Sequence, residues 1–281
     1  MNATSAVDRP PPAFLYGTAW KEEATQQLVL LALRQGFRGI DTANQRRHYH
    51  EAAVGQGLAE AFRDGWVTRD DLFLQTKFTF RGGQDHRLPY DPAAPIAKQV
   101  EQSFASSLEH LGVEQLDSYV LHGPSQRIGL ARDDWSAWRA MEELHASGRT
   151  RRLGVSNVSL DQLQRLCGEA RVRPSFVQNR CYAVRGWDRG VREFCREHAI
   201  VYQGFSLLTA NREVLGDPRM QQIATRHGRS PAEIVFRFAQ QIGMLPLTGT
   251  TDPAHMLTDL SVGQFQLDDA EVQLVDQMGA A

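Results

Sequence analysis

The chain alternates short strand-like runs with amphipathic segments along nearly its whole length. β-branched and aromatic residues gather in eight runs, at 14–19, 37–43, 71–78, 116–122, 151–157, 175–180, 200–206 and 243–249. Segments with helical periodicity separate them, so each strand is followed by a helix that can return the chain to the next parallel strand. The alternation predicts an α/β protein.

The expected helices have chemically marked ends. Ser159 with Gln162, and Ser230 with Glu233, have the capping-box spacing in which each side chain satisfies a backbone amide of the other residue. Gly112 follows an apolar helical stripe and can take the left-handed conformation that ends a helix. These marks support the helical reading of the segments between the strands.

A closed barrel explains eight strand-helix units better than an open sheet. An open dinucleotide-binding sheet would normally show GxGxxG after its first strand, and the chain has no such motif there. We therefore expect a (β/α)8 TIM barrel, which typically takes about 250 residues. No linker rich in Gly, Ser or Pro divides the interior, so we expect one domain over 1–281, with 1–12 a flexible N-terminal segment.

Composition excludes several classes of function. The 281 residues include 31 basic and 33 acidic ones, with a formal charge of -2, which does not favour nucleic-acid binding. No apolar run reaches the roughly 18 residues of a membrane span. The start of the chain has no apolar leader. We expect a cytoplasmic protein, a monomer or weak homodimer, that uses neither nucleic acid nor membrane as a partner.

The three cysteines do not form a recognisable framework. Cys167, Cys181 and Cys195 are widely spaced and odd in number, which suits neither a disulfide set nor a zinc site. We expect ordinary structural thiols.

Polar residues stand where the expected strands end. Asp41 follows the second strand, Lys77 the third and His122 the fourth. Active sites of TIM barrels lie at these carboxyl ends. A lysine and an aspartate at the rim of an apolar barrel would be desolvated without a partner, so we expect Lys77 to pair with Asp41. Such a pair could serve structure or function.

Tyr49 favours function. An ammonium near its phenol would lower the pKa of Tyr49, which would then suit a general acid. With His122 donating to the same oxygen, the group could bind a carbonyl and protonate it. No activated Ser or Cys motif supplies a nucleophile, and a hydride from a reduced nicotinamide would fill that gap.

Motifs over nearly the whole chain resemble one known family. In chain order they are YGTAW, GFRGIDTA, DLFLQTKF, LDSYVLHGP, GRTRRLGVSN, VQNR and LTGTTDPAHMLTDL. Together they resemble the aldo-keto reductases. The resemblance implies a barrel that binds a nicotinamide cofactor without a Rossmann motif, NADP by preference and NAD as a possibility. It also implies reduction of the carbonyl group of small-molecule aldehydes or ketones.

The resemblance further implies residue roles. Tyr49 would donate the proton, Lys77 would tune Tyr49, Asp41 would hold Lys77, and His122 would orient the carbonyl. Ser156, Asn157 and Gln178 would bind the nicotinamide carboxamide and Phe205 would stack on its ring. The other implied cofactor residues are Ser206 and Leu208 at the pyrophosphate, Gly17, Thr18, Trp20 and Asp41 near the nicotinamide, and Gly249, Thr250, His255 and Asp259 after the eighth strand.

The loop that carries the tyrosine departs from the family pattern. The family's tyrosine usually follows the aspartate by five positions and precedes a glutamate by three. Here Tyr49 follows Asp41 by eight and precedes Glu51 by two, while His48 stands three before that glutamate. We expect the lengthened loop 44–50 to bulge so that Tyr49 points inward, with His48 as the alternative acid.

The same loop could in principle bind metal. His48 and His50, with Asp41 and His122 nearby, could ligate zinc. Solvated histidines in a polar loop are commoner, so we expect no metal.

The segment after the eighth strand also departs from the pattern. The lysine and arginine that often grip the 2′-phosphate are replaced by Gly249 and His255, followed by Asp259, while Thr250 remains. Because each charge-assisted bond contributes on the order of 1.5–3 kcal/mol, we expect relaxed cofactor choice that still leans to NADPH.

Only three residues follow the expected last helix, whereas many relatives have a long tail over the mouth. We expect an open, aromatic pocket walled by Trp20, loop 123–134 and Trp187, which accepts bulky carbonyl compounds. Two other functions stay open: a Schiff-base lyase using Lys77, and a non-catalytic nicotinamide-binding subunit, which Tyr49 facing solvent would favour.

Overall fold

The computed structural model describes residues 10–279, and within that range eight parallel strands close into a barrel in chain order. Each strand lies inside one of the eight expected runs and is shorter than it. This confirms the TIM barrel. The strands are β1 Leu15–Gly17, β2 Gly39–Asp41, β3 Phe73–Phe78, β4 Ser118–Leu121, β5 Leu153–Ser156, β6 Phe176–Arg180, β7 Val201–Phe205 and β8 Met244–Thr248. Most of the expected N-terminal segment 1–12 lies outside the described residues.

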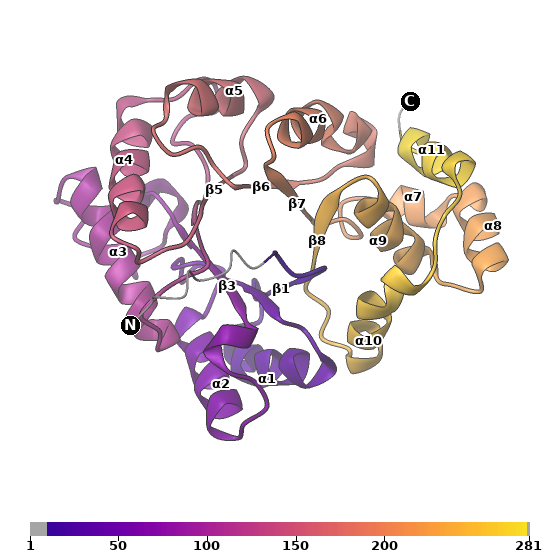
Figure 1. The fold of residues 1–281 in the computed structure, drawn as a ribbon, viewed down its shortest axis with the longest axis horizontal. Coiled ribbons are helices and arrows are strands. Elements are labelled where there is room, and N and C mark those ends of the chain that lie inside the picture. The colour runs from indigo at the N-terminus through magenta and orange to yellow at the C-terminus, as the bar shows by residue number, and fades with distance from the viewer. Residues whose placement is uncertain (1–9, 280–281) are drawn as a thin grey trace, which may run out of the picture.

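Helices surround the strands as a ring (Figure 1). They are α1 Thr25–Gln35, α2 Glu51–Arg63, α3 Ile96–Leu111, α4 Arg132–Ala146, α5 Leu160–Glu169, α6 Arg189–Glu197, α7 Arg212–Gly216, α8 Pro218–His227, α9 Pro231–Gln241, α10 Pro253–Ser261 and α11 Asp269–Gln277. In the part of the chain that the structure describes, no helix is both long and apolar enough to cross a membrane.

The expected helix ends are confirmed. Ser159 Oγ accepts from Gln162 N at 3.2 Å, and Gln162 Oε1 accepts from Ser159 N at 3.0 Å. Ser230 and Glu233 make the same reciprocal pair at the start of α9. Gly112 has a φ of 66° and ends α3. These local signals fix where each helix turns back toward the next strand.

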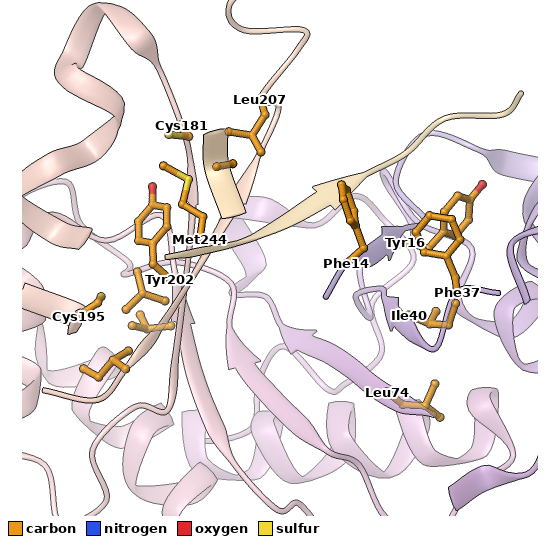
Figure 2. Packing of buried hydrophobic residues seen from close by; sticks show 14 of the residues in the cluster. Phe14, Tyr16, Phe37, Ile40, Leu74, Cys181, Cys195, Tyr202, Leu207 and Met244 are labelled. Atoms are coloured by element: carbon orange, nitrogen blue, oxygen red, sulfur yellow. The ribbon is translucent and has the colours of Figure 1, made fainter. Parts of the chain in front are cut away.

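The main apolar layer lies between the strands and the helices. Figure 2 shows part of it, with Tyr202 and Met244 in one group of side chains and Phe14, Tyr16 and Phe37 in another. The three cysteines are buried free thiols, as expected, and all belong to this layer.

The inside of the barrel is apolar mainly toward the amino-terminal ends of the strands. A small separate cluster contains Leu15, Phe73, Phe176 and Leu245. The rings of Phe73 and Phe176 meet edge to face, with centroids 5.4 Å apart. Because side chains two residues apart share a face of a strand, the inward positions above this floor are Gln75 and Lys77 on β3, Gln178 and Arg180 on β6, and Gln203 and Phe205 on β7. The interior therefore becomes polar toward the carboxyl ends of the strands.

Candidate active site

A buried ion pair joins β2 to β3 at the carboxyl end of the barrel. Lys77 Nζ donates to both Asp41 carboxylate oxygens, at 2.8 and 2.7 Å, and to the Thr42 carbonyl at 2.8 Å. Lys77 is 0% and Asp41 2% exposed. Burial lowers the pKa of Lys77, and the Asp41 carboxylate opposes that change. The expected pairing is thus present, and all three donor positions of the ammonium are used, which disfavours a Schiff-base nucleophile.

Three glutamines form a layer directly beneath this pair. Gln75 Nε2 and Gln178 Nε2 donate to Asp41 Oδ1 at 2.7 and 2.9 Å. Both also donate to Gln203 Oε1, and Gln203 Nε2 returns a bond to Gln75 Oε1 at 3.0 Å. These amides hold the Asp41 carboxylate in place. Since Lys77 is bonded to that carboxylate, side chains of the barrel strands also fix the position of the Lys77 ammonium.

The lengthened loop folds back as a single tight turn. His48 N and Tyr49 N both donate to the Gln45 carbonyl, at 3.1 and 3.0 Å. Gln45 is 6% exposed, and its Nε2 donates to the Gly83 carbonyl at 2.6 Å. The extra residues are therefore taken up in a turn whose base is anchored to the loop after β3.

Tyr49 lies beside the ion pair and beside His122. Its ring centroid is 5.2 Å from Lys77 Nζ and 5.9 Å from the His122 ring, which it meets at 68°. Burial raises the pKa of Tyr49, and the Asp41 carboxylate adds to this. The expected lowering of the pKa is wrong, because burial disfavours the charged phenolate and the Asp41 carboxylate offsets the ammonium charge that was to lower the pKa. The phenol is consequently protonated at neutral pH.

His48 faces a different neighbour. Its ring lies 4.0 Å from the Trp20 ring, and its carbonyl accepts from Trp20 N at 2.7 Å. Trp20 is 71% exposed, so the two rings form a wall at the outer rim of the mouth. Burial, and then the charge of Arg47, lower the pKa of His48. The structure therefore places Tyr49, and not His48, in contact with the Lys77–Asp41 pair.

His122 is neutral and oriented. Its Nδ1 lies 2.6 Å from Thr79 Oγ1, and the Thr79 carbonyl in turn accepts from Tyr90 Oη at 2.8 Å. Burial, together with the Lys77 ammonium, lowers the pKa of His122 to about 3. If the Thr79 hydroxyl donates to Nδ1, the imidazole proton resides on Nε2 and can be offered to another group.

The β5 and β6 ends bring three expected cofactor residues together. Ser156 Oγ donates to the Gln178 carbonyl at 2.6 Å, and Asn157 Nδ2 donates to the His122 carbonyl at 2.8 Å. Gln178 Nε2 is turned down toward Asp41. Within residues 10–279, Gln178 Oε1 and Asn157 Oδ1 accept no hydrogen bond, because both side chains are held through their NH2 groups. Two amide acceptors thus remain for the NH2 group of a carboxamide, which fits the expected nicotinamide.

Strained backbone marks the same end of the barrel. Trp20, Asn157 and Ser206 have φ values of 62°, 52° and 57°, in the left-handed region that favours glycine. They follow β1, β5 and β7. Such conformations cluster at ligand sites because the surrounding structure enforces them.

The β7 end carries the expected stacking ring and an unexpected cation. Phe205, Ser206 and Leu208 are half-buried at the mouth. Arg180 Nε donates to Ser206 Oγ at 3.2 Å, and its guanidinium carbon lies 5.9 Å from the Phe205 ring centroid. A positive charge therefore adjoins the ring and hydroxyl expected to meet the cofactor.

A second cation lies at the seam between β1 and β8. Lys21 is 7% exposed, and its Nζ donates to the Gly249 carbonyl at 2.7 Å. Burial lowers the pKa of Lys21 to about 8. No carboxylate of the described residues forms an ion pair with it.

The other residues near β8 are less open to a ligand. Thr18 is buried and donates to the Asp41 carbonyl at 3.0 Å. Asp259 is buried and accepts from Thr248 Oγ1 at 2.7 Å, whereas His255 is exposed and Thr250 half-buried. Gly17 pairs with Asp41 in the sheet register.

Trp187 does not line the mouth, so the expectation that it forms a pocket wall is wrong. It is 0% exposed, its Nε1 donates to the Val275 carbonyl at 3.1 Å, and its ring packs on Phe238. The large apolar ring is covered by α11, where its burial is more favourable than exposure at the rim would be.

Five contributors were missed from the sequence: Gln75, Gln203, Thr79, Arg180 and Lys21. Four of them stand at even spacing from residues that were identified. Gln75 and Thr79 flank Lys77 by two positions, Gln203 precedes Phe205 by two, and Arg180 follows Gln178 by two. Since alternate residues of a strand point to the same side, stepping two positions along each strand from the identified residues would have found these four.

The candidate site is identified by the arrangement of its side chains and not by the volume of a cavity. A cavity of about 810 Å³ lies on the outside of the barrel between α4 and α5, but none of the residues of the ion pair lines it. In the described part of the chain, no group of three or more His, Cys, Asp or Glu side chains could hold a metal ion. The chemistry at the mouth is that of the ion pair, the phenol and the imidazole.

The chain is similar in sequence to known reductases and related enzymes. The chain is 28% identical over 256 residues to "9,11-endoperoxide prostaglandin H2 reductase" of Trypanosoma cruzi, covering 90% of this chain and 82% of that protein. It is 30% identical over 272 residues to "NAD(P)H-dependent 6'-deoxychalcone synthase" of Glycine max, covering 90% and 81%.

Solved structures of aldo-keto reductases have the same fold as this chain. An aldo-keto reductase of the silkworm Bombyx mori superposes with a TM-score of 0.82 at 25% identity, covering 96% of this chain and 85% of the other. An aldo-keto reductase complexed with NADPH superposes with a TM-score of 0.81 at 25% identity over the same shares. The profile of the Aldo/keto reductase family matches residues 14–280. The chain therefore belongs to the aldo-keto reductase family of NAD(P)H-dependent oxidoreductases.

Proposed function

We propose that the protein reduces aldehyde or ketone carbonyls with NADPH, and that Tyr49 donates the proton. The observation that carries this proposal is the contact of the Tyr49 ring with both Lys77 and His122 at the carboxyl end of the barrel. These are the groups that carbonyl reduction needs at one point: a protonated phenol, a fixed cation and a neutral imidazole.

Proton delivery follows from the charge state of each residue. The raised pKa of Tyr49 keeps the phenol protonated until a developing alkoxide accepts its proton. The lowered pKa of His122 keeps the imidazole neutral, so it can donate a hydrogen bond from Nε2 without itself losing a proton. The Lys77 ammonium then stabilises the phenolate that is left, and Asp41 holds Lys77 in place. A bound reduced nicotinamide supplies the hydride.

The cofactor would be held by residues at the carboxyl ends of β5, β6 and β7. Gln178 and Asn157 have acceptor atoms for the carboxamide, and Phe205 offers a ring for stacking. Near β8 the family's lysine is replaced by Gly249, but Lys21 Nζ lies 2.7 Å from the Gly249 carbonyl. One positive charge thus remains at this seam, which supports use of NADPH with weakened rejection of NADH.

The substrate would enter along the aromatic wall formed by Trp20 and His48. Their ring centroids lie 4.0 Å apart with the planes tilted by 36°, and the exposed part of Trp20 offers apolar area to a bulky carbonyl compound. The proposed substrates are accordingly aromatic or branched aldehydes and ketones.

The experiment is a carbonyl panel read by nicotinamide absorbance, with wild type, Tyr49→Phe and His48→Gln. We expect Tyr49→Phe to lower kcat by roughly 10²–10⁴-fold, the usual contribution of a general acid, with unchanged NADPH affinity. His48→Gln should change KM and retain kcat. Retained turnover in Tyr49→Phe together with its loss in His48→Gln would transfer the role to His48.

A further inference from the structure

We propose that Arg180 binds the diphosphate of the nicotinamide cofactor, an inference that rests on the proposed function. Arg180 ends β6 at the mouth of the barrel. Three features support this assignment: Arg180 points into the mouth, its guanidinium contacts Ser206, and it has no carboxylate partner among residues 10–279.

The strand pattern aims Arg180 into the mouth. Phe176 packs on Phe73 inside the barrel, and Gln178 reaches Asp41 there. Since alternate residues share one face of a strand, Arg180 continues this inward row one step higher. Its register partner on β7 is Phe205, the ring expected to stack on the nicotinamide.

The guanidinium is held next to a hydroxyl expected at the pyrophosphate. Arg180 Nε donates to Ser206 Oγ at 3.2 Å, and Nη1 lies 3.5 Å from Tyr182 Oη. Both contacts are to neutral oxygens. Arg180 is exposed, and within residues 10–279 no carboxylate forms an ion pair with it. A fixed guanidinium without a counter-charge, reachable from solvent, is suited to an anionic ligand.

A diphosphate fits this position better than the other parts of the cofactor. The planar guanidinium offers parallel N–H donors that match phosphate oxygens. The neighbouring expected cofactor residues Ser156, Asn157 and Ser206 carry no charge, so Arg180 would supply the main electrostatic attraction on this side. The nicotinamide ring itself would lie on Phe205, between Arg180 and the Asp41–Lys77 pair.

The test is the dissociation constant of wild type and variants for NADPH, NADH and ADP-ribose, measured by calorimetry without any carbonyl substrate. ADP-ribose carries the diphosphate and lacks the nicotinamide. We expect Arg180→Met to weaken all three by at least about tenfold, as loss of a charge-assisted bond would, and Arg180→Lys to weaken them less. The ratio between NADPH and NADH should stay unchanged.

Arg185→Met is the matched control. Arg185 is also exposed and lies over the ring of Tyr182, at 5.2 Å, but it has no recorded contact with Phe205 or Ser206. Its replacement should leave the three dissociation constants as they are. Circular dichroism of each variant shows whether the barrel is intact.

Three outcomes would overturn the inference. Unchanged affinity for ADP-ribose in Arg180→Met would remove the diphosphate contact. A loss confined to NADPH would assign Arg180 to the 2′-phosphate. Unchanged cofactor affinity with a raised KM for a carboxylate-bearing aldehyde would assign it to substrate. Wild-type protein that binds none of the three probes would instead end the proposed function, and the inference with it.

Discussion

The two sides of the barrel mouth differ in how completely their polar groups are satisfied. On the side of β2 and β3, Asp41 Oδ1 accepts from Lys77, Gln75 and Gln178, all of them nearly inaccessible to solvent. On the other side, Arg180 at the end of β6 and Lys21 at the seam between β1 and β8 are cations without a carboxylate partner among residues 10–279. The first side is completed by the fold alone, whereas the second would be completed by a charged ligand.

This difference separates two kinds of requirement. A proton donor must be held in place before the substrate arrives, because geometry that forms late lowers the rate. A cofactor site must release its ligand, so its charges are better left to be satisfied by that ligand. If the side chains of the first side are as strongly coupled as their contacts indicate, replacing one of them should cost more stability than replacing an exposed residue of the same type.

The largest effect is expected from removing one member of the buried ion pair. Lys77→Met leaves the Asp41 carboxylate buried without its counter-charge, which should lower the free energy of unfolding by about 3–5 kcal/mol. Urea denaturation measures it. Lys98→Met, which removes an exposed pair with Glu101, should cost less than about 1 kcal/mol. Equal losses in the two variants would contradict the coupling.

A smaller effect is expected from the glutamine layer. Gln203→Leu removes the partner of two buried amides, those of Gln75 and Gln178, and should lower the free energy of unfolding by about 1–3 kcal/mol. The exposed Gln221→Leu should change it by less than about 0.5 kcal/mol. A neutral or stabilising Gln203→Leu would show that the layer only fills space.

His122 predicts an acid-dependent loss of stability. Its pKa is lowered in the folded protein to about 3, so the unfolded chain binds the proton first as pH falls. The contribution is complete above the ordinary histidine pKa near 6.5 and declines below it, by about 1 kcal/mol between pH 6.5 and pH 5.5. Urea denaturation across this range should show a shallower decline in His122→Gln; the same slope would count against a buried neutral imidazole.

The smallest effect is expected on the outer surface of the tyrosine loop. Arg46 Nη1 lies 2.8 Å from Glu22, which is half exposed, and such pairs contribute little in water. Arg46→Ala should lower the free energy of unfolding by less than about 1 kcal/mol and leave kcat unchanged. A large fall in kcat would mean that this pair, and not the anchored Gln45, holds the turn.

The repeated pattern explains why the fold could be predicted. Eight strand-like runs and marked helix ends are local signals, and closure of the barrel follows from their number and order. The same logic located Asp41, Lys77 and His122, because the carboxyl ends of parallel strands converge.

The features that the sequence did not predict depend on contacts between segments that are distant in the chain. The direction of the Tyr49 pKa shift was predicted wrongly because its largest cause is burial of the phenol, which depends on how the loop folds back and not on any local pattern. The packing of Trp187 against Val275 and Phe238 joins residues far apart in the chain, and no local pattern distinguishes it from a pocket wall. The position of the lengthened loop depends on the bond from Gln45 to Gly83, which the loop sequence does not reveal.

The most direct measurement is a crystal structure of the NADPH complex. We expect the Tyr49 ring to lie against Lys77 and His122 as it does now, with its hydroxyl pointing toward the nicotinamide and the Asp41–Lys77 pair unchanged. A Tyr49 ring turned into solvent, with His48 or water in its place beside Lys77, would contradict it.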